Sequence, residues 1–274
     1  MDLVKQNPFQ DLRARNIILA ILVSVSIMWF IGPKRNVFGI GLNLIYFWRF
    51  WFHAVELIWV LWNLIKLRIS FKRIIGRFPN DYGGWLITVG IAVLLVIFAV
   101  GSSSIKHKLI SFLLNSPSPV RGHLKLSIFQ APFVIIVLPI VEELFFRGFL
   151  LHRWTVKWNI KLAILVSTFI FAIFHTNFIG ALAYGFGLAA LYIKTQTLML
   201  PIFCHILINS LVFGFEVVDV QLLLTSRLWF GLLCLVLSVP CIAYLTYGNW
   251  PDHHWKAPYF NNYNGSKDFL TDRR

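Results

Sequence analysis

The chain has 274 residues, of which 58% are hydrophobic and 13% are charged, with a mean hydropathy of +0.73. A soluble domain is closer to about half apolar and a quarter charged. The apolar residues form long runs without strict alternation, which excludes a soluble globular domain and an outer-membrane β-barrel. The net charge of +14 comes from basic residues between the apolar runs, which favours contact with anionic lipid headgroups over binding of nucleic acid.

Eight apolar runs come close to the roughly twenty residues that a membrane-spanning helix needs. The first run has no cleavage site after it, so we interpret it as an uncleaved span. The second run is long and contains Arg49, His53 and Glu56. These three residues are either a second polar site or, as we prefer, a salt-bridged or interfacial face of a tilted helix. The predicted spans are 16–32, 39–65, 85–101, 128–150, 161–178, 180–194, 198–216 and 227–246.

The sequence therefore predicts an all-α polytopic membrane protein of about eight transmembrane helices. Residues 1–127 would hold the first three spans and their basic loops. Residues 128–216 would hold spans four to seven, and residues 217–274 the last span and a polar tail. The loops on the side of the two termini carry sixteen Lys and Arg residues, against seven on the other side. The positive-inside bias then places both termini in the cytoplasm.

The fourth predicted span carries three charged residues, although charge at membrane depth is costly and usually marks a functional site. Glu143 and Arg147 are one helical turn apart, so they share a face and are expected to pair. Glu142 is turned by about 100° from Glu143, which leaves its carboxylate to face another helix. The Glu143–Arg147 pair has an equally plain interpretation as a packing contact that supports the site.

Two later spans add polar residues at a similar depth. His175 lies on the fifth span, and His205 and Asn209 share one face of the seventh. A rise of about 1.5 Å per residue places these side chains and Glu142 at about 16–22 Å from the inner ends of their spans. Four polar groups on three helices are therefore able to form one site.

Their chemistry suits hydrolysis of a carbonyl group by activated water. A buried glutamate can take a proton from water, and a neighbouring histidine can hold that water or share the base role. A second histidine with an asparagine can donate hydrogen bonds to a developing oxyanion. The sequence has no Gly-x-Ser-x-Gly elbow and no His-Glu-x-x-His zinc helix. A proton-coupled transporter is the alternative, although no internal repeat is present.

Three motifs resemble those of the CPBP family, which includes CAAX prenyl proteases and bacteriocin-processing and immunity proteins. EELFFR at 142–147 is similar to the EExxxR motif, FAIFH at 171–175 to FxxxH, and HILIN at 205–209 to HxxxN. They occur in the family's order on separate predicted helices. The resemblance covers about 128–216 and implies a CAAX-protease-like fold of eight helices, in which this segment is the catalytic core.

The resemblance implies an intramembrane endopeptidase. Its substrates would be membrane-anchored or hydrophobic peptides, among which prenylated CAAX-type peptides are one option. Glu142 with His175 would activate water, and His205 with Asn209 would form the oxyanion hole. The supporting residues would be Glu143 and Arg147.

The family has been described both as metalloproteases and as metal-free glutamic endopeptidases. We predict that no cofactor is required; if zinc binds, the expected ligands are Glu142, His175 and His205. The expected partners are the peptide substrate and the lipid bilayer of the plasma membrane, with no nucleic acid. A non-catalytic immunity or scaffold protein on the same fold stays open beside the transporter.

Overall fold

A computed structural model describes residues 44–76, 82–113, 131–175, 177–217 and 227–248, with a few isolated positions between 9 and 19. Every regular element within these residues is helical, so the predicted all-α class is confirmed. By length and composition, α4 and α8 are able to cross a membrane, and three further helices are apolar but shorter. The chain is a membrane protein built from apolar helices.

The described residues form seven long helical rods, where the sequence predicted about eight. The predicted span 16–32 lies almost entirely outside the described residues. One rod is composite, because two π-helical segments interrupt it and widen its turns. The elements are α2 (Leu44–Lys66), the short α3 (Phe71–Ile75), α4 (Tyr82–Leu113), the composite η3 (Phe133–Val137), α5 (Leu138–Glu143), η4 (Leu144–Leu150) and α6 (Leu151–Lys157), then α7 (Ile160–Ile173), α8 (Phe178–Thr195), α9 (Met199–Val217) and α11 (Leu228–Gly248).

Helix α4 is longer than predicted, because it continues through part of the expected loop 102–127. Ser102 and Ser104 turn their hydroxyl groups back onto carbonyl oxygens of the preceding turn, at 3.1 and 3.0 Å. Serines bonded in this way remain inside a helix instead of ending it. The segment from 102 to 113 also lacks Gly and Pro, so nothing in it stops the helix.

Helix α7 is shorter than predicted, and His175 lies in the turn after it rather than on it. Asn177 begins the next helix: its Oδ1 accepts a hydrogen bond from the backbone N–H of Gly180 at 3.2 Å. Its Nδ2 donates to the carbonyl oxygen of Ala99 at 3.1 Å. Asparagine is a preferred N-cap residue, so Asn177 starts α8 and ties the His175 turn to α4.

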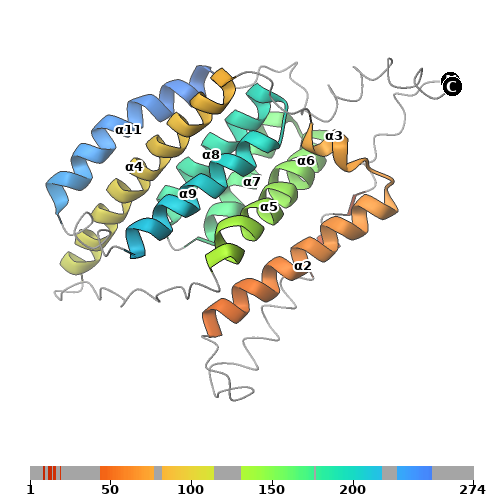
Figure 1. Ribbon diagram of the computed structural model, residues 1–274, viewed down its shortest axis with the longest axis horizontal. Coiled ribbons are helices and arrows are strands. Elements are labelled where there is room, and N and C mark those ends of the chain that lie inside the picture. The colour runs from red at the N-terminus through yellow and green to blue at the C-terminus, as the bar shows by residue number, and fades with distance from the viewer. Residues whose placement is uncertain are drawn as a thin grey trace.

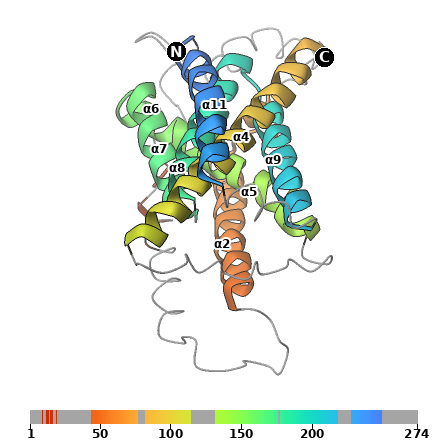
Figure 2. The ribbon, with the colours of Figure 1, turned by 90° about the vertical axis from the view of Figure 1, so that its left-hand side faces the viewer.

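Helix α8 lies at the centre of the bundle (Figure 1). Helices α4, α7 and α9 pack against it, and α11 packs along α4. Helix α2 lies at one edge, where it contacts α5 and η4 (Figures 1 and 2). The composite rod therefore contacts α2 on one side, and it contacts α7 and α9 on its other sides.

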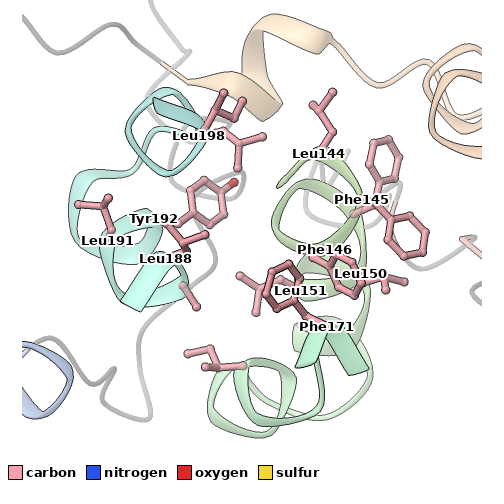
Figure 3. Packing of buried hydrophobic residues seen from close by; sticks show 14 of the residues in the cluster. Leu144, Phe145, Phe146, Leu150, Leu151, Phe171, Leu188, Leu191, Tyr192 and Leu198 are labelled. Carbon is pink, nitrogen blue, oxygen red and sulfur yellow. The ribbon is translucent and has the colours of Figure 1, made fainter. Parts of the chain in front are cut away.

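The core joins α8 to the composite rod and α7. Leu188 and Tyr192 face Phe146, Leu151 and Phe171 across the interior (Figure 3). Three small residues, Ala181, Gly185 and Ala189, form a ridge along the same helix. A Cβ on Gly185 would lie 2.8 Å from Thr168 Cγ2. The ridge is therefore a packing surface on which α8 approaches α7 closely.

Candidate active site

The composite rod carries the motif EELFFR at 142–147. Its first part, η3, is π-helical, and the hydrogen bonds around Pro139 show why. In η3 the backbone N–H of Leu138 bonds to Phe133 O, one residue further back than in an α-helix. The next residue, Pro139, has no N–H. The carbonyl oxygen of Val134 therefore has neither of its possible donors within the helix. It accepts a hydrogen bond from Asn209 Nδ2 at 3.0 Å.

Glu143 and Arg147 form the predicted ion pair, with Arg147 Nη1 2.7 Å from Glu143 Oε1. Both side chains are almost completely buried. Arg147 Nη2 also donates to the carbonyl oxygen of Gly185 at 3.1 Å, and the guanidinium lies 4.7 Å from the ring centre of Phe171. The pair thus connects the composite rod with α7 and α8.

His205 contacts both glutamates of the motif. Its Nδ1 lies 2.9 Å from Glu143 Oε1, and its Nε2 lies 3.4 Å from Glu142 Oε2. The ring of Tyr184 packs edge-on against the imidazole at 4.8 Å. The carboxylate of Glu143, which is paired with Arg147, accepts a hydrogen bond from Nδ1–H of His205. This contact directs Nε2 of His205 at Glu142.

His53 and Glu56 on α2 belong to the same cluster, which sequence reasoning missed. His53 Nε2 lies 3.4 Å from Glu142 Oε1, and its Nδ1 lies 2.8 Å from Glu56 Oε2. Both side chains are buried. The preferred interpretation of this polar face is therefore confirmed as salt-bridged, because His53 pairs with Glu56. It is wrong as interfacial, because the face is buried against Glu142. The side chain of Arg49, the third residue of that face, lies outside the described residues.

Glu142 is thus held between two imidazoles, one on each carboxylate oxygen. The predicted site residues Glu142, Glu143, Arg147 and His205 are brought together directly. The signal that could have identified His53 was its spacing of three residues from Glu56, which puts an acid and a base on one helical face.

His175 reaches this cluster through an aromatic contact. Its ring lies 4.3 Å from the ring of Phe171, which lies 6.1 Å from that of His205. Its Nδ1 donates to the carbonyl oxygen of Phe171 at 2.8 Å. A carbonyl oxygen can only accept, so in the neutral ring the lone pair is on Nε2. His175 is therefore in the tautomer that offers Nε2 as a base.

Asn209 lies one turn from His205, and its side chain bonds to Val134 on the composite rod. A side-chain amide nitrogen has two hydrogens. The contact with Val134 uses one and leaves the second for another acceptor. A role in packing and a role toward an oxyanion are therefore compatible.

The three predicted zinc ligands, Glu142, His175 and His205, do not converge on one point. Among the described residues, no three His, Cys, Asp or Glu side chains are arranged to hold a metal ion. Within the predicted set, Glu142 and His205 are in contact, whereas His175 directs its Nδ1 at a backbone carbonyl. These residues do not fit a zinc site as they lie, and no step below passes through a metal.

Part of the chain is similar to known proteins. Residues 124–211 match the family described as Type II CAAX prenyl endopeptidase Rce1-like. The match to this family covers about a third of the chain. This segment contains all three motifs and Glu142, Glu143, Arg147, His175, His205 and Asn209.

A curated relative supports the same assignment. The chain is 38% identical over 95 residues to "Putative membrane peptidase YdiL" of Bacillus subtilis (strain 168). This match covers 32% of the chain and 39% of the relative. No solved structure matches the chain significantly. Helix α2, with His53 and Glu56, lies outside the residues that match the family.

Proposed function

We propose that the protein is an intramembrane endopeptidase that hydrolyses peptide bonds of membrane-anchored or hydrophobic peptides. The observation that carries the proposal is the buried Glu142 carboxylate, which has one imidazole at each oxygen and sits among apolar helices. A buried carboxylate is costly, so its retention beside two bases indicates proton transfer.

The proposed reaction uses water as the nucleophile. Glu142 takes a proton from water with the help of His175 Nε2, and the water oxygen attacks the carbonyl carbon of the peptide. The second N–H of Asn209 donates a hydrogen bond to the resulting oxyanion, and Nε2 of His205 donates one when the ring carries a proton on both nitrogens. The proton then passes to the amide nitrogen, the C–N bond breaks, and a carboxyl group and an amine leave.

Glu143 and Arg147 support this chemistry without touching the reacting atoms. Their ion pair holds His205 through its Nδ1, which fixes where Nε2 points. Arg147 also anchors the composite rod to α8 through Gly185. We propose no resident metal for the reaction. The plasma membrane is the proposed location, with both termini in the cytoplasm.

The test is cleavage of a panel of quenched fluorescent peptides, lipidated and unlipidated, by the purified protein in detergent or liposomes. Wild type, Glu142→Gln and Gly214→Ala are compared, each with and without a chelator. Gly214 lies on α9 with nothing within 4 Å of an added Cβ, so Gly214→Ala is the matched control. Cleavage that is lost only in Glu142→Gln and is indifferent to chelator supports the proposal. Loss with chelator and recovery with zinc would contradict the metal-free part.

A second candidate is a proton-coupled transporter, because the site is a buried chain of titratable groups from Glu56 to Glu143. Such chains also serve as proton relays in transporters. Substrate flux driven by a pH gradient in liposomes, without peptide cleavage, would favour it. If the Glu142→Gln gene complements a deletion strain, a non-catalytic role is favoured instead.

A further inference from the structure

The contacts of Glu142 are mirrored on its two sides. On one side the order is Glu143, His205, Glu142; on the other it is Glu56, His53, Glu142. In both arms a second carboxylate contacts Nδ1 of the imidazole, and Nε2 faces a Glu142 oxygen at 3.4 Å. The site therefore has two histidine–carboxylate arms, one from α9 and one from α2.

The α2 arm is held in place by aromatic contacts on both sides of His53. Phe52 packs against Phe174 at 4.8 Å, next to the turn that carries His175. Trp59 packs against Phe145 at 5.5 Å, on the rod that carries Glu142. These contacts fix the rotation of α2 about its axis, which directs His53 and Glu56 inward.

The two arms differ in charge. Glu143 is paired with the buried cation Arg147 and orients its histidine. Glu56 has no ion-pair contact within the described residues except His53, and its Oε1 is buried there without a hydrogen-bond donor. A buried carboxylate without a strong cation is costly, and binding a proton removes that cost. The α2 arm is therefore suited to take up a proton, and the α9 arm is not.

The contact between His53 Nδ1 and Glu56 Oε2 holds a proton, and the position of that proton decides what Nε2 offers to Glu142. With the proton on Nδ1 of the neutral ring, Nε2 is a proton acceptor. With the proton on Glu56, Nε2 carries a hydrogen and is a donor. Movement over 2.8 Å within one hydrogen bond thus switches His53 between its two roles.

We propose that His53 and Glu56 form a proton-storing arm of the active site. This inference rests on the proposed peptidase function. Glu142 takes a proton from water and passes it to His53 Nε2, while the Nδ1 proton moves to Glu56. When the C–N bond breaks, the transfers reverse, and Glu142 delivers the proton to the departing amine. Water supplies the hydroxyl of the new carboxyl group and one hydrogen of the amine, so atoms and charge balance.

The titratable and charged groups around this arm come from every element that packs there. They are Glu142 and Glu143 from α5, Arg147 from η4, His205 from α9, Tyr184 from α8, Glu56 beside His53 on α2, and His175 from the turn after α7. Titrations of such coupled groups belong to the cluster as a whole. The test therefore compares complete pH profiles and does not assign a single value to one residue.

The decisive variant is Glu56→Gln, because glutamine keeps the shape and a hydrogen bond to His53 but cannot store a proton. We expect kcat to fall roughly 10- to 100-fold, with KM changed less than about threefold. One limb of the pH profile of kcat should move by about one pH unit or more. His53→Gln should show the same pattern. The control is Asn63→Ala, which removes a buried side chain of α2 whose hydrogen bond within the described residues is local, to Trp59 O at 2.8 Å.

The melting temperature in detergent separates a structural role from this one. Glu56→Gln should melt within a few degrees of wild type, since its packing is preserved. A folded Glu56→Gln protein with unchanged kcat and pH profile would overturn the storage role, while the peptidase proposal would stand if Glu142→Gln is inactive. If wild type cleaves nothing, the peptidase proposal fails by itself.

A second readout does not need turnover. The infrared band of a protonated carboxyl group can be assigned to Glu142 if it is present in wild type and missing in Glu142→Gln. Its titration midpoint should shift by about one pH unit or more in Glu56→Gln and stay in place in Asn63→Ala. An unshifted midpoint would overturn the coupling of the α2 arm to Glu142, whatever the substrate.

Discussion

The guanidinium of Arg147 donates a hydrogen bond to the backbone carbonyl of Gly185, with Nη2 3.1 Å from that oxygen, although the residues are 38 positions apart. The contact is possible because Gly185 has no side chain: an added Cβ would lie 2.8 Å from Thr168 Cγ2 and 3.3 Å from Phe171 Cδ1. Helix α8 can therefore approach close enough for its backbone to complete the coordination of a buried charge.

Gly185→Ala should destabilise the protein. The added methyl group meets a β-branched side chain, which has little freedom to move within a helix. Overpacking of this kind costs about 1–3 kcal/mol, partly offset by about 1 kcal/mol of helix propensity. The melting temperature in detergent should fall, whereas Gly214→Ala, with open space around its Cβ, should leave it unchanged or raise it. Equal melting of the two variants would contradict the close packing.

Arg147→Met should be more damaging than loss of the same charge on the surface. It leaves Glu143 buried without its cation, and removing one partner of a buried pair costs about 3–5 kcal/mol. The double variant Arg147→Met with Glu143→Gln removes both charges and should recover much of the melting temperature. Activity should stay low in the double variant, because His205 loses the carboxylate that orients it. If the double variant melts no higher than Arg147→Met, the unpaired charge of Glu143 is not what destabilises Arg147→Met.

Asn177→Ala should lower both stability and kcat. The variant removes the cap of α8 and the bond to Ala99, at a cost of about 1–2 kcal/mol, and it loosens the turn that carries His175. Asn159 is a matched control, since its Oδ1 caps α7 by accepting from the N–H of Leu162 at 2.9 Å, at an exposed position. Asn159→Ala should lose stability without a change in kcat. If kcat falls by a similar factor in Asn177→Ala and Asn159→Ala, the contacts of Asn177 do not position His175, and the prediction is contradicted.

The sequence was sufficient to predict the parts of the site that depend on local spacing. Glu143 and Arg147 are four residues apart and do pair, and the estimated depths allowed Glu142 and His205 to meet, as they do. The described helices also lie close to predicted runs, apart from the ends of α4 and α7 and the end of the composite rod, which continues through α6 to Lys157.

The role of α2 was not predictable in the same way. A histidine and a glutamate three residues apart indicate a polar face, but only the packing of α2 on the composite rod determines that this face meets Glu142. The contact of Asn209 was hidden for another reason. It depends on a π-helical turn, and a 3.6-residue periodicity cannot reveal a change of backbone register.

The role of Asn209 can be tested by restoring the backbone N–H that Pro139 lacks in the composite rod. Asn209→Ala leaves Val134 O without the hydrogen bond that replaces the N–H absent at Pro139, which should cost about 1–3 kcal/mol. Pro139→Ala restores a backbone N–H, so the double variant should regain melting temperature relative to Asn209→Ala.

The kinetics of the double variant then distinguish the two roles of Asn209. If the residue also donates to the oxyanion, kcat should stay about 10²- to 10³-fold below that of Pro139→Ala even though stability recovers. Recovery of kcat together with stability would show that Asn209 acts only through Val134, and the oxyanion would then depend on His205 and other donors. Failure of Pro139→Ala to restore stability would instead contradict the explanation of the π-helical turn by the missing N–H.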